Sequence, residues 1–360
     1  MEWKDINIEK LRELPLAELV RIYHELGIDA QIDYDKFYLY SIITHSTAIE
    51  GSTVTELENQ LLFDEGITAK GRSLQEQMMN LDLKNAYEWG MEQIRQHPAI
   101  TIDFLRTLSA KVMARTGNEY NTLNGSFSAA KGDIRLLNVT AGFGGKSYMN
   151  FLKVPMYLEK FCKELNERRS AIDASNVQSI YEMSFWAHYE LVTIHPWADG
   201  NGRATRLLMN LLQMEFGVLP MKVTKEEKGE YIQALIDTRD KEDISIFLST
   251  MTHLQEQHLR EEIIAFVDSM LEGGQKTEKV DRNDTKDDTK ELSERQKVIV
   301  SLIQEDDTIT INGMIQKTNV SSITIKRDLA VLQELNVIKR EGGRKQGRWV
   351  IVAKGKELEG

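Results

Sequence analysis

The sequence predicts a mainly α-helical protein with a short β-hairpin in its helical core and a small α/β domain near its C-terminal end. Only five of the 360 residues are proline, and Leu, Glu, Lys and Met, which favour helices, are abundant. The hydrophobic fraction of 41% can fill a sizeable core. The length is typical of two or three domains.

Apolar residues recur at helical spacing in three stretches, at 11–27, 181–196 and 203–217. The first and third stretches end at a glycine and the second ends at a proline, as helices commonly do. The glycine-rich and β-branched stretch 138–155 interrupts this pattern, and it predicts a loop with a short hairpin.

We expect four segments along the chain: an N-terminal helical region at 1–109, a core domain at 110–271, a linker at 272–290 and a C-terminal domain at 291–360. The linker contains one Val and no other large apolar side chain, so it cannot bury enough surface to fold alone. Residues 290–360 hold 13 Lys and Arg against 10 Asp and Glu, a charge of +3, and the remainder of the chain carries −14. This asymmetry indicates parts with different roles.

The composition also bears on the cellular location. The one cysteine, Cys162, excludes an internal disulfide, fits a reducing compartment, and is expected to be a small buried hydrophobe. The first ten residues are charged, and no stretch has the roughly 18 apolar residues of a membrane span. We therefore expect a soluble, cytoplasmic protein with no membrane partner. The net charge of −11 argues against nucleic-acid binding by the chain as a whole.

The stretch HPWADGNGRATR, residues 195–206, joins two of the predicted helices. Gly200 and Gly202 allow a tight turn and leave amide N–H groups uncovered at a helix N-terminus, where the helix dipole favours an anion. Arg203 and Arg206 lie on the first turn of that helix, and arginine grips phosphate oxygens in a bidentate manner. The stretch therefore predicts a site for a di- or triphosphate.

Two further side chains in this stretch bear on chemistry. His195 can take up a proton near neutral pH, and Asp199 can hold Mg²⁺ together with phosphate oxygens. The same two residues, four apart, would also fit a surface pair or a pair of transition-metal ligands. The complete set of base, carboxylate, glycines and arginines favours catalysis over a structural turn.

These residues resemble the signature of Fic-domain proteins, His-x-Phe-x-(Asp/Glu)-Gly-Asn-Gly-Arg-x-x-Arg, with Trp197 at the position of the usual Phe. We expect Trp197 to anchor the loop in the core. The resemblance covers roughly 40–265 and is strongest at 110–240. It implies a Fic-type helical core and a protein adenylyltransferase. Such an enzyme transfers AMP from ATP to a Ser, Thr or Tyr hydroxyl of a target protein, or of itself, and releases pyrophosphate.

The resemblance also implies a role for each residue of the motif. His195 would deprotonate the attacking hydroxyl, and Asp199 would bind Mg²⁺ between the α- and β-phosphates. Five residues would bind the phosphates of ATP: Gly200, Asn201, Gly202, Arg203 and Arg206. Phosphoryl-type transfer depends mainly on positioning and charge stabilisation, which such a loop supplies.

Two other parts of the resemblance concern the target and the base. The loop 145–155 corresponds to the family's flap, a hairpin that pairs with the target segment by β-augmentation. The flap residues expected at the target are Lys146, Ser147, Tyr148 and Met149. Tyr231 matches a position where the family often has a Tyr near adenine, although a core tyrosine is an equally good interpretation. Arg239 stands where many members have Asn.

The stretch STAIEG, residues 46–51, resembles the (Ser/Thr)-x-x-x-Glu-(Gly/Asn) pattern of an inhibitory helix, expected here near 36–51. Ser46 and Glu50 are one helical turn apart and share a face. A Glu50 carboxylate that reaches Arg206 would take the place of the γ-phosphate within the same chain. ATP would then bind with its α-phosphate poorly placed for attack.

Residues 291–352 predict the order helix, short strand, helix, turn, helix, hairpin, which resembles a winged helix-turn-helix domain. The segment VSSITIKRDLAVL, residues 320–332, is similar to the recognition helix of DeoR-type bacterial regulators. Candidate DNA contacts are Thr324, Lys326, Arg327, Arg344, Lys345 and Arg348. Protein interaction is the alternative to DNA binding, and a homodimer would suit either.

Two rival functions stay open at this point. The same site could transfer another phosphate-containing group, or remove AMP from a modified protein with Glu50 positioning water. Alternatively, the chain could be a DNA-binding regulator whose Fic part only senses nucleotide, although binding phosphate does not require a base such as His195.

Overall fold

The computed structural model describes residues 3–31, 34–141, 146–274, 294–318, 325, 328–329, 332, 337–341 and 348–352. The chain forms two compact units, Met1–Val280 and Asp281–Gly360. The division falls within the predicted linker 272–290, although the last helix of the first unit continues to Gly274. The predicted boundary after residue 109 has no counterpart, because helices on both sides of it share one core.

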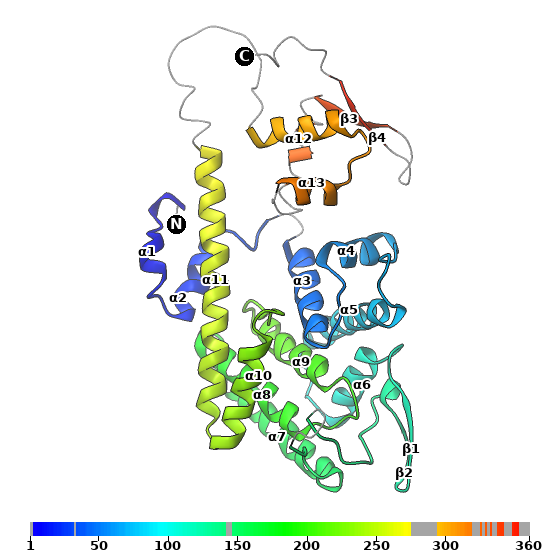
Figure 1. Ribbon diagram of the computed structural model, residues 1–360. Helices are drawn as coiled ribbons and strands as arrows, with labels where there is room; N and C mark the ends of the chain where they lie inside the picture. The colour runs from blue at the N-terminus through cyan, green and yellow to red at the C-terminus, as the bar shows by residue number, and fades with distance from the viewer. Residues whose placement is uncertain are drawn as a thin grey trace. The chain divides into compact units, whose positions relative to one another are not determined.

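The described part of the first unit is mainly helical (Figure 1). Its α-helices are α1 (Ile8–Leu11), α2 (Leu16–Glu25), α3 (Tyr34–Ile49), α4 (Glu56–Glu65), α5 (Leu74–Ile94), α6 (Ile102–Val112), α7 (Val154–Ala171), α8 (Val177–Ile194), α9 (Asn201–Glu215), α10 (Lys228–Lys241) and α11 (Ile244–Gly274). Short 3-10 helices lie at Trp3–Asp5, Ala129–Lys131 and Phe151–Lys153. The strands are β1 (Glu119–Thr122) and β2 (Gly125–Ser128).

Helix α9 forms the centre of this unit. It packs against α3, α5, α6 and α8, and nearly all of its side chains are buried, polar ones included. In Figure 1, α9 lies between the α3–α6 group and the α8, α10 and α11 group. A helix enclosed in this way brings its N-terminus into the protein interior, where its free backbone N–H groups require a partner.

Three local features differ from the sequence-based expectation. The stretch 11–27 forms two helices, since Pro15 is the N-cap residue of α2 and separates it from α1. The β1–β2 hairpin, with antiparallel pairs from Glu119–Ser128 to Thr122–Gly125, was not predicted. The hairpin predicted within 138–155 is limited to an antiparallel bridge between Thr140 and Ser147.

The second unit contains α12 (Glu294–Glu305), α13 (Ile311–Thr318) and the antiparallel strands β3 (Ile338–Glu341) and β4 (Arg348–Ile351). Its core includes Ile299, Ile303, Ile325, Leu332 and Trp349. This order of helices and hairpin confirms the small α/β domain. The short strand predicted between the first two helices is instead a turn at 306–310, because the Asp306 carboxylate accepts a hydrogen bond from the amide of Thr308.

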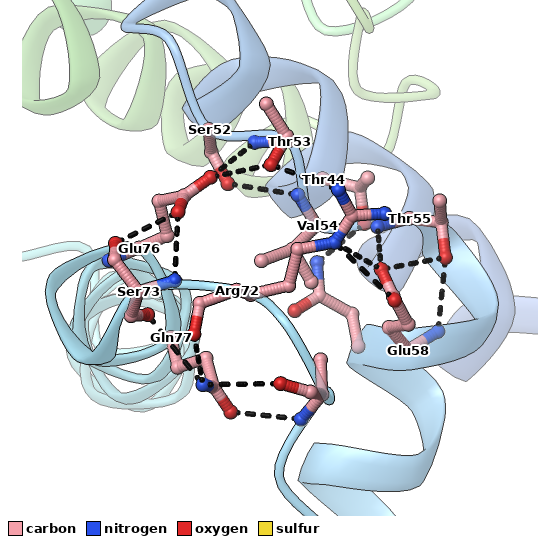
Figure 2. Close-up of polar contacts among 12 residues, drawn as sticks. Thr44, Ser52, Thr53, Val54, Thr55, Glu58, Arg72, Ser73, Glu76 and Gln77 are labelled. Atoms are coloured by element: carbon pink, nitrogen blue, oxygen red, sulfur yellow. Dashed lines mark hydrogen bonds and ion pairs between the residues drawn. The ribbon is translucent and has the colours of Figure 1, made fainter.

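The segment between α3 and α5 is fixed by carboxylates that each serve two partners (Figure 2). Glu76 closes a capping box with Ser73 at the start of α5, and its other oxygen accepts bonds from the backbone and hydroxyl of Thr53. These donors hold the pKa of Glu76 near 2. Glu58 closes a second box with Thr55 and pairs with Arg72 at 3.1 Å. The chain immediately after α3 is therefore attached to α4 and α5.

Asn80 of α5 lies under this segment and is fully buried. Its amide nitrogen donates to Ser52 Oγ at 3.1 Å and to Glu76 O at 2.8 Å. Its oxygen accepts from Thr47 Oγ1 and Asn59 Nδ2, both at 2.8 Å. One side chain thereby joins the end of α3 to α4 and α5 through four hydrogen bonds.

We expect Asn80→Ala to lower the free energy of unfolding by roughly 2–4 kcal/mol, because it leaves several buried polar groups without partners. Chemical denaturation of the full chain measures this loss. Gln75→Ala, on the exposed face of the same helix, is the matched control and should change stability by less than about 0.5 kcal/mol. Equal effects of the two substitutions would contradict the role given to Asn80.

Candidate active site

The loop between α8 and α9 begins at His195, which adopts the left-handed conformation with φ of 52°. The His195 amide still donates to Leu191 O at 3.0 Å, and Pro196 then prevents the helix from continuing. Trp197 is 1% exposed and its indole N–H donates to Gly132 O at 3.2 Å. The aromatic ring therefore anchors the loop in the core, and His195 holds a backbone conformation that is strained for a side chain of this kind.

The imidazole of His195 has two defined neighbours. Its Nδ1 lies 3.2 Å from Val192 O, and a proton on Nδ1 that bonds this carbonyl leaves Nε2 as the basic nitrogen. The ring stacks on Tyr148 of the flap, with centroids 3.6 Å apart and planes 15° apart. Burial lowers the pKa of His195 to about 4, with a further lowering by Arg135. The side chain is therefore neutral, and able to accept a proton, near pH 7.

The N-terminus of α9 has no side-chain cap and offers hydrogen-bond donors to an anion. Gly200 is the N-cap residue with φ of 78°, and no side chain caps the helix there. Arg203 is 4% exposed, and its Nε and Nη1 have no hydrogen-bond partner among the described residues. A buried guanidinium with free donors beside a helix N-terminus is a strong site for phosphate oxygens.

The structure brings Ser46, Glu50 and Arg206 together. Arg206 is 3% exposed, its Nε donates to Ser46 Oγ at 2.9 Å, and its Nη2 donates to Ser46 O at 2.9 Å and to Glu50 Oε1 at 2.6 Å. Burial alone would raise the pKa of Glu50, but the charge and hydrogen bond of Arg206 hold it below its usual value. Glu50 is thus an anion in the position expected from the sequence.

Glu50 also lies against the start of α9. A Cβ added at Gly202 would be 2.4 Å from Glu50 Oε1, so the carboxylate is packed directly over this glycine. The Glu50 side chain is 37% exposed, whereas the Arg206 side chain is 4% exposed. The carboxylate therefore lies over the first turn of α9 on the solvent side, and the Arg206 guanidinium lies beneath it.

Asn201 and Asp199 have local partners in the loop. The Asn201 side chain accepts from Trp197 N at 3.1 Å and donates to Trp197 O at 2.8 Å. Asp199 Oδ1 accepts from Gly200 N at 2.6 Å and lies 3.8 Å from Arg203 Nη2, and the side chain is 53% exposed. Asn201 therefore maintains the loop, and Asp199 presents a carboxylate to solvent.

The donor set fits Mg²⁺ only in combination with phosphate. Among the described residues, no group of three or more His, Cys, Asp or Glu side chains could hold a metal ion. Mg²⁺ is usually bound by one or two carboxylates together with waters and substrate phosphates, and Asp199 offers one such carboxylate.

Tyr231 does not fit contact with adenine and corresponds to the other interpretation, a core tyrosine. Its ring is 1% exposed and packs beside His188 and Phe247, and its hydroxyl is 2.8 Å from His188 Nε2. A base cannot stack on a ring that is enclosed in this way. The sequence did not distinguish the two roles because both place Tyr231 on the inner face of α10.

Of the predicted flap residues, Tyr148 stacks on the His195 ring, and the other three have different partners. Lys146 Nζ is 2.6 Å from Asp240 Oδ1 of α10, and Ser147 forms the bridge to Thr140. Met149 is partly buried against the main core, and its carbonyl accepts a bond from Arg135. Arg135 is fully buried and was not identified from the sequence, because a single arginine outside a motif carries no pattern.

The candidate DNA contacts are placed only in part. Arg348 is the first residue of β4 and is exposed. Thr324, Lys326, Arg327, Arg344 and Lys345 lie outside the described residues. Ile325, Leu329 and Leu332, in or beside this segment of the sequence, are buried.

Each of the two units contains a region that matches a known protein family. Residues 99–213 match the Fic/DOC family, and residues 295–346 match the DeoR-like helix-turn-helix domain. The protein adenylyltransferase Fic of Drosophila persimilis is 28% identical over 203 residues, which cover 54% of this chain and 35% of that protein. Protein adenylyltransferase fic-1 of Caenorhabditis elegans is 27% identical over 204 residues, covering 56% and 36%. The chain thus spans about a third of the length of these relatives.

Solved structures show the same fold. A fragment of Fic-1 from Caenorhabditis elegans is similar with a TM-score of 0.55 and 24% identity over 72% of each chain. A Fic family protein from Desulfovibrio desulfuricans G20 has a TM-score of 0.56 and 18% identity over 97% of each chain.

The first unit therefore contains a region, residues 99–213, that matches the Fic/DOC family and includes the loop that carries His195. The second unit contains a DeoR-like helix-turn-helix domain. Both expectations from the sequence are confirmed.

None of the helices in the described ranges has the length and apolar character required to cross a membrane.

Two buried histidines should make the protein sensitive to acid. Burial lowers the pKa of His188 to about 3 and that of His195 to about 4, from the ordinary value of 6.5. Between pH 6.5 and 4 the unfolded chain binds protons on these residues that the folded chain does not, so stability is complete above this range and is lost as the pH falls. Each histidine contributes a slope of up to about 1.4 kcal/mol per pH unit.

Urea denaturation from pH 7 to pH 4 measures this slope. We expect His188→Gln to reduce it, whatever its effect on stability at pH 7. If stability falls with pH at the same slope in the unchanged protein and in His188→Gln, His188 does not cause the acid sensitivity.

Proposed function

We propose that this chain is a protein adenylyltransferase that transfers AMP from ATP to a hydroxyl of a target protein and of itself. The observation that carries the proposal is Arg203, a buried guanidinium with unpaired donors in the first turn of α9, directly after the loop that holds the neutral His195. The matched relatives are named protein adenylyltransferases, which supports this reaction over nucleotide sensing alone.

In the proposed reaction, the target hydroxyl oxygen forms a bond to the α-phosphorus, and the bond from this phosphorus to the oxygen that bridges to the β-phosphorus breaks. Nε2 of His195 accepts the hydroxyl proton, since Nδ1 faces Val192 O. Pyrophosphate leaves with the bonding electron pair. The target hydroxyl must reach Nε2 of the His195 imidazole, on which the Tyr148 ring stacks.

The start of α9 would stabilise the phosphates. The backbone N–H group at Gly202 and the free donors of Arg203 would bind the oxygens, whose negative charge the helix dipole also favours. The Gly200 N–H, which now donates to Asp199 Oδ1, would have to exchange this acceptor for a phosphate oxygen. Asp199 would hold Mg²⁺, which would neutralise charge on the α- and β-phosphates. Asn201 would act indirectly, because its amide is bonded to Trp197.

Glu50 would inhibit the reaction from within the chain. Its carboxylate forms an ion pair with Arg206 and covers Gly202, which is the space that the terminal phosphate of ATP needs. An ATP molecule that binds beside it cannot use Arg206 to align its phosphates. The position of Glu50 is secured by Ser46, whose hydroxyl and carbonyl both accept from Arg206.

We expect Glu50→Gly to raise self-modification by roughly 5–150-fold, the usual range for coupling between two states of a site. Glu50→Gln should have a smaller effect, because it keeps the size of the side chain and loses only its charge. Incubation with α-labelled ATP measures the incorporation. Glu65→Gly, at the exposed end of α4, is the control and should behave as the unchanged protein.

His195→Ala should abolish incorporation in the unchanged protein and in Glu50→Gly, because no other base takes its place. Unchanged incorporation in Glu50→Gly would disprove inhibition by Glu50, and incorporation without His195 would disprove its role as base. Mass spectrometry of a pre-labelled target distinguishes removal of AMP, which would require Glu50.

We also propose that the second unit binds double-stranded DNA, since residues 295–346 match a DeoR-like helix-turn-helix domain. Its net positive charge contrasts with the strongly negative first part of the chain. The exposed Arg348 at the start of β4 is suited to a phosphate contact.

Gel shifts of the full chain with random duplex DNA should show binding that weakens as the salt concentration rises. The double substitution Lys326→Ala and Arg327→Ala should weaken binding and reduce the salt dependence by about one counterion per lost phosphate contact. Lys163→Ala, on the exposed face of α7, is the control. Absence of binding at low salt would favour protein interaction, which sedimentation of the chain alone would detect for a homodimer.

A further inference from the structure

A buried arginine connects the flap to the loop that carries the base. Arg135 lies in the segment between the Ala129–Lys131 helix and the flap, and it is 0% exposed. Its Nε donates to His195 O at 2.7 Å, and its Nη1 donates to Leu137 O at 2.7 Å. Its Nη2 donates to Met149 O, and its backbone N–H donates to Pro196 O at 3.0 Å.

These acceptors belong to three places in the chain. Leu137 and Met149 lie on either side of the antiparallel bridge between Thr140 and Ser147, and we call residues 137–140 and 147–149 the two arms that carry the flap. His195 and Pro196 are the first residues of the active-site loop. One guanidinium therefore fixes both arms of the flap relative to the peptide group that follows the base.

The partners of Arg135 are unusual for a buried cation. All are backbone carbonyls, and no ion pair to a carboxylate is present for it within the described residues. Burial lowers the pKa of Arg135 accordingly. A neutral side chain of the same length would avoid the cost of burying a charge, so packing alone does not account for an arginine.

We infer that Arg135 is a positioning residue, which holds the His195 peptide and the target-binding flap in one fixed geometry. The inference rests on the proposed function in assigning the flap to the target and His195 to the proton. Tyr148, next to Met149 in the second arm, stacks on the His195 ring, so a shift of the flap moves the surface that faces the base. The strained φ of His195 is retained because its carbonyl is held by Arg135 and its amide by Leu191.

The hydrogen bonds of the Arg135 side chain all go to backbone carbonyls outside the phosphate cradle of Arg203 and Arg206, which separates its effect from nucleotide binding. Its loss should therefore act on the rate of transfer and on the flap. The charged and titratable groups that influence the imidazole are Arg135, which lowers its pKa, and Glu50 of the α3 end, which raises it. Loss of the cation should thus raise the pKa of His195, while burial, the largest cause of its lowering, remains.

The test uses full-length Arg135→Met and Arg135→Lys, each with Glu50→Gly to provide a high rate. Arg135→Met should lower kcat for transfer by about tenfold or more, with the KM for ATP changed by less than about threefold. Arg135→Lys keeps the charge, but its three N–H donors radiate from one nitrogen and cannot reproduce the planar fork that reaches three separate carbonyls, so it should also lower kcat, without the pKa change. Arg95→Met, at the exposed end of α5, is the matched control and should change neither value.

Two readouts do not depend on transfer. Trypsin should cleave at Lys146 several times faster in both Arg135 variants, because the flap arms are released. An NMR titration of His195 should show the raised pKa in Arg135→Met only. If Arg135→Met does not fold, kcat and the rate of trypsin cleavage are measured on Arg135→Lys instead.

Unchanged kcat and unchanged cleavage at Lys146 in a folded variant would overturn the inference. An equal fall in kcat and rise in KM for ATP would also do so, because it would indicate a general loss of structure. If Glu50→Gly itself transfers no label, the proposed function fails, and the trypsin and NMR results still decide the role of Arg135.

Discussion

The start of α9 concentrates positive charge inside the protein, and the arrangement around it follows from the need to balance that charge. Arg203, Arg206 and an uncapped helix N-terminus are buried together. Glu50 supplies an anion from the end of α3, although a carboxylate at a helix C-terminus is unfavourable for its own helix. The ion pair compensates for this placement, and Arg203 retains the capacity to bind a second anion.

The Glu50 carboxylate that balances this buried positive charge comes from the N-terminal helices. These helices therefore belong to the same structural unit as the loop that carries His195. Asn80, Glu76 and Glu58 fix the chain that follows Glu50 to α4 and α5, and α5 packs directly on α9. The carboxylate is therefore placed by a rigid network instead of by a free helix end. In the proposed inhibited state, its release requires movement of α3 or competition by another anion.

The sequence predicted most residues of the candidate site, but it did not predict the buried residues that hold the site in place. The stretch 195–206 identified the loop because its histidine, carboxylate, glycines and arginines each have a distinct chemical role. The pattern at 46–51 was sufficient to predict that Glu50 lies near Arg206. Arg135 and Asn80 could not be found in this way, since their partners are backbone carbonyls and distant side chains that only the fold brings together. The β1–β2 hairpin has an Asn124–Gly125 turn signal, but its strands lack apolar alternation.

The pairing of Glu50 with Arg206 within one chain has a further consequence. The effective concentration of this carboxylate at the guanidinium is set by the fold, so dilution of the protein does not separate the two groups. The occupancy of the α9 N-terminus then depends on the abundance of competing anions and not on the number of copies of the protein. A cell that makes few molecules and a cell that makes many would hold the same fraction in this arrangement.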